Sequence, residues 1–150
     1  MEEVSGEAAG AAWQMGWAVE DQEPFASDHV RSPDDARRLL APRFHEAASE
    51  KVVVLQLDDA RRLLAAREYP GSADAADLPL REIVADALRL GSTSLVLAHN
   101  HPSGDAEPSE ADLRTSRLLA DTARNLGMRL IDHLIFAGED VRSLRDLGLL

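Results

Sequence analysis

Three short apolar segments, separated by two amphipathic helical segments, most strongly limit the folds open to this chain. Each has the length of a strand and is rich in branched or apolar residues: Lys51–Leu57, Thr93–Ala98 and Met128–Phe136. Between them, apolar residues recur at helical spacing over Pro79–Leu90 and Ser109–Asn125. This alternation predicts an α/β (α+β) fold, a single domain with a central mixed sheet flanked by helices.

Capping and turn residues predict the other elements. Ser32 is placed to cap a helix that has Pro33 at its first position, runs through about Leu40 and ends near Pro42. Asp58-Asp59-Ala60 predicts a turn into a further strand, Arg62–Glu68. The remaining predictions are loops at Pro70–Asp77 and His99–Pro108, helix ends at Gly91 and Gly127, a turn at Gly138, and a short last helix that begins at Ser143-Leu144-Arg145.

The length of 150 residues fits one domain. Residues 1–30, rich in Gly, Ala and Glu without a sustained period, are predicted to form a flexible N-terminal arm, and 31–150 the folded domain. The arm has no basic start followed by an apolar run, and no apolar stretch in the chain approaches the ~20 residues that a membrane span needs. We therefore expect a cytoplasmic protein without a membrane partner.

Charge and cysteine content restrict the chemistry. Lys and Arg number 16 against 27 Asp and Glu, for a net charge of −11. This balance argues against a nucleic-acid partner, because such affinity rests largely on basic groups that neutralise phosphates. The chain has no cysteine, so any metal must be bound by histidines and carboxylates.

One polar segment has the spacing of a metal site. His99 and His101 are two residues apart where a strand is predicted to end, and in extended backbone such residues project to the same side. Ser109 and Asp112 are three apart in the first turn of a predicted helix, which places them on one helix face. Ligation by His99, His101 and Asp112 would leave a fourth tetrahedral position for water, as in catalytic zinc sites.

This segment resembles a known family. H-x-H, seven residues, Ser, two residues, Asp matches the JAMM motif of the JAB/MPN metalloproteins, and the string HNHPSGD is similar to the RadC branch of that family. Asp132-His133 and Ser143-Leu144-Arg145 extend the likeness, which covers roughly residues 31–150. The resemblance implies a zinc-dependent hydrolase of amide bonds, with one Zn²⁺ per chain and a peptide or protein substrate.

The resemblance also assigns roles to single residues. It implies His99, His101 and Asp112 as zinc ligands. Glu50, immediately before the strand KVVVLQL, is implied as the general base, and Ser109 as a donor to the tetrahedral oxyanion.

Simpler interpretations stand beside these roles. Ser109 and Asp112 also have the spacing of a helix capping box, which is compatible with metal binding. Glu46 lies on a segment near Glu50, and His45-Glu46 begins like an HExxH zinc motif but has Ser at position 49. Asp132-His133, on an apolar strand, is interpreted as a core pair or an outer-shell group without a catalytic role.

Two alternative functions remain. One is a non-catalytic JAB/MPN binding module, which the complete ligand set argues against. The other is a RadC-type protein associated with DNA repair, which the negative charge argues against, as does the lack of a recognisable helix-hairpin-helix-like region in residues 1–30.

Overall fold

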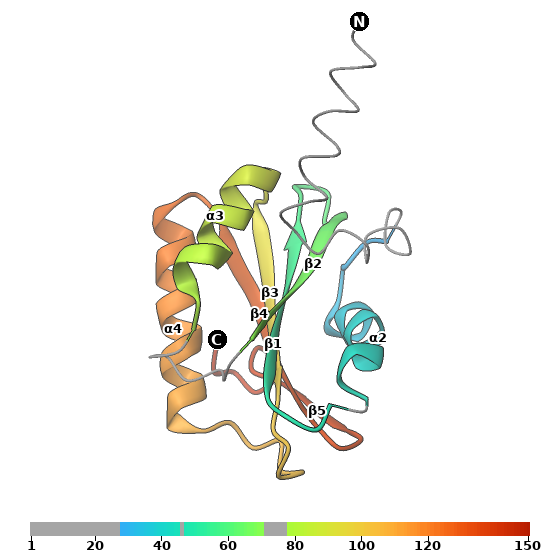
Figure 1. The fold of residues 1–150 in the computed structure, drawn as a ribbon. Helices are drawn as coiled ribbons and strands as arrows, with labels where there is room; N and C mark the ends of the chain where they lie inside the picture. The colour runs from blue at the N-terminus through green and yellow to red at the C-terminus, as the bar shows by residue number, and fades with distance from the viewer. Residues whose placement is uncertain (1–27, 46, 71–77) are drawn as a thin grey trace, which may run out of the picture.

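Five strands form one mixed sheet between two layers of helices (Figure 1). The computed structural model describes residues 28–45, 47–70 and 78–150. The strand order is β2-β1-β3-β4-β5, in which only β3 and β4 run parallel. The elements are α2 (Pro33–Phe44), β1 (Lys51–Leu57), β2 (Leu63–Pro70), α3 (Leu80–Leu90), β3 (Ser94–Asn100), α4 (Glu110–Asn125), β4 (Arg129–Ala137) and β5 (Asp140–Ser143). The predicted α/β class with a central mixed sheet is confirmed.

The two faces of the sheet bury separate apolar cores. Helix α2 covers one face, and α3 and α4 cover the other (Figure 1). Along β1, Val53 and Leu55 contribute to the α2 core, whereas Val52 and Val54 contribute to the α3/α4 core, as the two-residue period of a strand requires. Every residue of β3 is buried, which explains why its sequence reads as a continuous apolar run.

Strand pairing brings the polar segment to one end of the sheet. β1 and β3 are antiparallel with Val52 opposite His99, and β3 and β4 are parallel with His133 opposite Leu97. Helix α4 is the crossover between these parallel strands, so its first turn lies near the carboxyl end of β3. Ser109 is its N-cap, as predicted.

Helix α2 begins as predicted but ends later. Ser32 is the N-cap and accepts a hydrogen bond from the Asp35 backbone N–H at 3.2 Å. The helix continues past Pro42 to Phe44, so the predicted end near Pro42 is wrong. The Phe44 ring stacks on Phe136 with centroids 4.7 Å apart. In the last helical turn, this packing outweighs the one backbone hydrogen bond that a proline removes.

Three further predictions need correction. Strand β3 runs to Asn100, so His99 and Asn100 belong to the strand and not to the predicted loop, because both are buried and pair with β4. The predicted helix that begins at Ser143 is wrong: Ser143 ends β5, and turns follow it. Its hydroxyl donates to the Asp132 carboxylate at 2.6 Å, which fixes this segment against the sheet. Strand β2 lies one to two residues further along than Arg62–Glu68.

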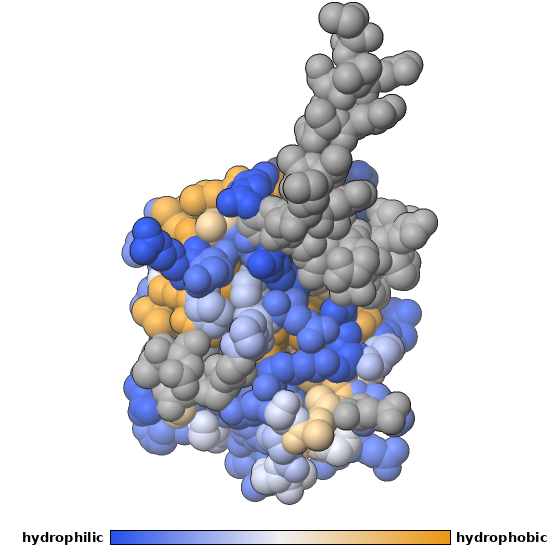
Figure 2. Space-filling view, viewed as in Figure 1, coloured by the Kyte–Doolittle hydropathy of each residue, from blue (hydrophilic) through white to orange (hydrophobic). Residues whose placement is uncertain are grey.

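Several predictions fall on residues outside the described ranges: most of the 1–30 arm, residue 46, and most of the loop at Pro70–Asp77. At the described end of the arm, His29 pairs with Arg62 in an isolated bridge and Val30 is buried in the α2 core. Among the described helices, none has the length and apolar character to cross a membrane. Hydrophobic surface gathers over α3 and α4 in Figure 2, and Leu88 on α3 is 60% exposed.

Candidate metal centre

Three side chains converge at the junction of β3 and α4. The Nε2 atoms of His99 and His101 lie 3.0 Å apart. One carboxylate oxygen of Asp112 is 3.1 Å from His99 Nε2, and the other is 3.0 Å from His101 Nε2. The structure thus brings together the three residues that the sequence analysis singled out, as a cluster that could hold a metal ion.

Each of these side chains is held by a different part of the fold. His99 is the second-last residue of β3, and His101 directly follows that strand. Asp112 is in the first turn of α4. His99 is 0% exposed and Asp112 is 4% exposed, whereas the His101 side chain keeps 16% of its surface accessible. The cluster therefore has a buried base and one edge that solvent reaches.

Outer contacts orient both imidazoles. His101 Nδ1 lies 2.7 Å from the backbone carbonyl of Asp105, which can only accept, so Nδ1 carries the proton and Nε2 presents a lone pair. His99 Nδ1 is 2.7 Å from His133 Nε2, and His133 Nδ1 contacts the Ser116 hydroxyl. These two contacts connect His99, His133 and Ser116. Donation from His99 Nδ1 to His133 would direct the His99 Nε2 lone pair into the cluster as well.

Sequence reasoning missed Ser116. Its position carried a usable signal, because Ser116 is four residues after Asp112 on α4 and therefore on the same helix face. It is 1% exposed. His133, interpreted from sequence as a core or outer-shell group, is the residue that connects it to His99.

The surroundings lower the pKa values of Asp112 and His133, one in the cluster and one beside it. Burial raises the pKa of Asp112, but the adjacent His99 and His101 and the Ser109 backbone N–H outweigh burial and leave that pKa below its usual range. Burial, together with the neighbouring His99, holds the pKa of His133 well below that of a free histidine. Asp112 is therefore a carboxylate and His133 a neutral imidazole near neutral pH.

The donor set is of the kind that binds zinc. Two imidazole nitrogens with one carboxylate are a typical zinc donor set. One ligand atom from each of His99, His101 and Asp112 can be chosen so that all three atoms lie within 4.8 Å of one another. The two histidine nitrogens are 3.0 Å apart, and each lies beside a different oxygen of the Asp112 carboxylate.

The capping box that the sequence suggested is present and shares an atom with the cluster. The Ser109 hydroxyl oxygen accepts from the Asp112 backbone N–H at 3.1 Å. The Asp112 oxygen near His101 also accepts from the Ser109 backbone N–H at 2.9 Å. Capping and ligation are therefore compatible, and the cap leaves the hydroxyl hydrogen of Ser109 available for donation.

The strand register predicts a place for Glu50 near the cluster. Val52 is opposite His99, so the same antiparallel register continued by two residues puts Glu50 opposite His101. Val52 and Val54 face α3 and α4, and the same alternation extended beyond the start of β1 predicts Glu50 on that side of the sheet. Its side chain is partly exposed, which suits a group that meets a substrate.

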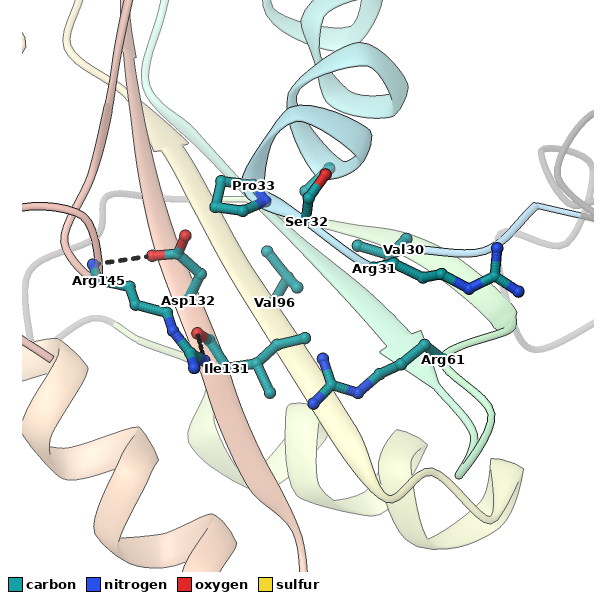
Figure 3. Close-up of a pocket in the computed structure, with 10 residues that line it drawn as sticks. Val30, Arg31, Ser32, Pro33, Arg61, Val96, Ile131, Asp132 and Arg145 are labelled. Carbon is teal, nitrogen blue, oxygen red and sulfur yellow. Dashed lines mark hydrogen bonds between the residues drawn. The ribbon is translucent and has the colours of Figure 1, made fainter.

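A separate cavity of about 470 Å³ lies on the α2 face of the sheet (Figure 3). Val96 and Ile131 line it from the strands, and three arginines, Arg31, Arg61 and Arg145, line it from other segments. Because Val96 and Ile131 belong to the α2 core, the sheet separates this cavity from the histidine cluster.

Asp132, also in the wall of this cavity, is a structural group. Its carboxylate accepts from the Ser143 hydroxyl at 2.6 Å and from the backbone N–H groups of His133 and Arg145 at 2.7 and 3.1 Å (Figure 3 draws the bond from Arg145). Burial outweighs these bonds and raises the pKa of Asp132. These contacts fit the sequence interpretation of Asp132 as a core or outer-shell group, and the absence of a catalytic role stays a prediction.

The fold and this centre define a mixed α/β domain with a candidate metal site made of two histidines and an aspartate. Residues 30–149 match the family described as the RadC-like JAB domain. The chain belongs to this family, as its resemblance to the RadC branch of the JAB/MPN metalloproteins predicted.

The relatives point the same way. The chain is 37% identical to a UPF0758 protein of Marinobacter nauticus, over 93% of this chain and 63% of the relative. It is 38% identical to one of Thioalkalivibrio sulfidiphilus over the same shares, and 39% identical to one of Bordetella petrii over 81% of this chain and 54% of the relative. The chain thus spans about three-fifths or less of the length of these curated relatives.

Proposed function

We propose that this chain is a zinc-dependent hydrolase of amide bonds, a metallopeptidase or isopeptidase of the JAMM type. The observation that carries the proposal is the convergence of His99, His101 and Asp112, which supplies three donors and keeps one edge accessible. Membership of the RadC-like JAB family supports the same chemistry. We propose these three residues as the ligands of one Zn²⁺ per chain.

The remaining roles fall to residues around the cluster. A zinc ion held by His99, His101 and Asp112 would supply Lewis acidity, which would lower the pKa of a water at the open position to roughly 7 and polarise a substrate carbonyl. Glu50 accepts the proton of the attacking water and delivers it to the leaving nitrogen. The Ser109 hydroxyl donates to the developing oxyanion, for which its uncommitted hydrogen is suited. The substrate is a peptide or protein that approaches the exposed edge at His101.

The first test measures metal content. Protein purified without a nickel column is analysed for bound metals, wild type beside His101→Ala. We expect about one zinc per wild-type chain, because three ligands define one site, and almost none in the variant. His45→Ala, which removes an exposed histidine at the end of α2, serves as the matched control and should retain the metal. Equal zinc in wild type and His101→Ala would contradict the assigned ligands.

The second test separates chemistry from binding. We expect Glu50→Gln to retain zinc and to lose hydrolysis of a mixture of fluorogenic peptides by a factor of about 10²–10⁴, the usual contribution of a general base. Hydrolysis at the wild-type rate would show that the base is another group. Zinc binding without hydrolysis by the wild-type protein would instead favour a non-catalytic JAB/MPN binding module.

A further inference from the structure

Asn100 lies between the two histidines, yet its side chain turns away from their cluster toward β1. Its carboxamide oxygen accepts from the Lys51 backbone N–H at 2.8 Å. Its carboxamide nitrogen donates to the Ser49 backbone carbonyl at 3.0 Å. Asn100 is 5% exposed, so both bonds are shielded from water. One side-chain amide therefore holds two backbone groups of another segment.

The two groups that Asn100 holds belong to the residues on either side of Glu50. The backbone pairing of β1 with β3 begins at Val52, and residues 47–50 before it have no regular structure. The Asn100 amide takes the place of a strand partner where this pairing has not yet begun. Asn100 thereby anchors the residues on either side of Glu50, which precede the first residue of β1 that pairs with β3.

Fixing both flanking peptides also fixes the direction in which the Glu50 side chain leaves the backbone. The alternation of Val52 and Val54, whose side chains face α3 and α4, predicts that Glu50 projects to the same side when its two peptides are held in line with β1. The same strand residue that makes the clamp is bonded to His99 on one side and His101 on the other. The backbone at Glu50 is thus held by a residue that is covalently next to both histidines, which fixes its position relative to them.

We propose that Asn100 is a positioning residue that sets the place of Glu50 relative to the metal ligands. The inference rests on the proposed function for its catalytic consequence. It accounts for an amide between the histidines, because a carboxamide offers an acceptor and a donor with the reach to hold both groups.

The clamp is tested first without a metal. Amide hydrogen exchange is measured by NMR on metal-free wild type, Asn100→Ala and the matched control Asn125→Ala, which alters an exposed asparagine at the end of α4. We expect exchange at Lys51 to accelerate about tenfold in Asn100→Ala alone, as for the loss of one hydrogen bond. Unchanged exchange at Lys51 would overturn the proposal.

The position of Glu50 is tested with Co²⁺ as the probe. Pseudocontact shifts of the backbone amides report their location relative to the ion. We expect the shift at Glu50 to change in Asn100→Ala while shifts in the central strands stay the same. Asn100→Asp, which keeps the oxygen and loses the donor to Ser49, provides a second variant if the alanine variant does not fold. An unchanged Glu50 shift in the variants would overturn the proposal.

The catalytic consequence is tested by a double-mutant cycle on zinc-loaded protein with the fluorogenic peptide mixture. We expect Asn100→Ala to reduce hydrolysis on the order of 10²-fold, as for a small misplacement of a catalytic group. In the Glu50→Gln background the same substitution should cause no further loss. Equal losses in both backgrounds would show that Asn100 does not act through Glu50. Full activity of Glu50→Gln alone would instead reject Glu50 as the general base of the proposed function, and the cobalt measurement would still decide the clamp.

Discussion

Asp112 and Asp132 are both 4% exposed, but their surroundings shift their pKa values in opposite directions. Asp132 accepts hydrogen bonds from a hydroxyl and two backbone amides, so its needs are met by neutral donors. Asp112 faces the Nε2 atoms of His99 and His101, and these two imidazoles together with the Ser109 backbone N–H lower its pKa despite burial. The comparison shows that the partners of a buried carboxylate, more than its burial, distinguish a structural group from a site that calls for a cation.

The largest difference is expected in zinc affinity, when one group is removed from the surroundings of Asp112 and one from the Asp132 site. His101→Ala should weaken zinc binding by more than the ~10–100-fold that outer-shell changes cause, because it removes a proposed ligand. Asp132→Ala should leave zinc affinity unchanged. Competition with a chromogenic zinc chelator measures both. Comparable loss of affinity in the two variants would erase the distinction between the sites.

The second contrast concerns stability. Asp132→Ala leaves the Ser143 hydroxyl and the backbone N–H groups of His133 and Arg145 without their acceptor, and we expect unfolding free energy to fall by about 3 kcal/mol. Urea unfolding of metal-free protein measures this loss. Asp140→Ala, at an exposed position on β5, is the matched control and should change stability by no more than ~0.5 kcal/mol. A loss as small as the control's would mean that Asp132 is not a structural anchor.

A smaller effect is expected one contact further from the candidate ion. His133→Asn interrupts the link between His99 and Ser116, and zinc affinity should drop by about 10–100-fold. Isothermal titration in the presence of a competing chelator resolves a change of this size. His45→Asn should bind zinc as wild type does. Unaltered affinity in His133→Asn would show that the outer contact does not orient His99.

The smallest expected effect is a gradual change of the unfolding free energy with pH. The pKa of His133 is lower in the folded protein than in the unfolded chain, so the unfolded chain binds more protons once the pH falls below about 6.5. Stability of metal-free protein should therefore decrease from about pH 7 to about pH 5.5, by up to about 1.4 kcal/mol per pH unit from this one group. His133→Asn should flatten the slope by that amount in urea titrations. An identical slope in the variant would assign the titration to other groups.

Local sequence signals were sufficient where one interaction dominates. The strand Lys51–Leu57 and helix α3 up to Gly91 match their predicted limits closely, since β-branched residues and a left-handed glycine determine them locally. Long-range contacts account for the errors. The stacking of Phe44 on Phe136 carries α2 beyond Pro42, and pairing with β4 extends β3 to Asn100. Neither partner is visible from the neighbouring sequence.

The candidate site divides in the same way. Spacing alone brought His99, His101 and Asp112 together as an expectation, because two residues on a strand and one on the next helix turn have few arrangements. The contacts from His133 and Ser116 and the clamp from Asn100 depend on which strands become neighbours. Strand order is a property of the whole sheet, so these supporting residues required the structure.

The shared oxygen of Asp112 has a mechanical consequence. The same atom receives the Ser109 N–H that starts α4 and faces His101 at the end of β3. An ion bound there would connect the first turn of α4 to the end of β3. Removal of the ion by a chelator would weaken this connection. The hydrogen-exchange rate of the Ser109 backbone amide should therefore report whether the candidate site holds a metal ion, and it can be measured without any substrate.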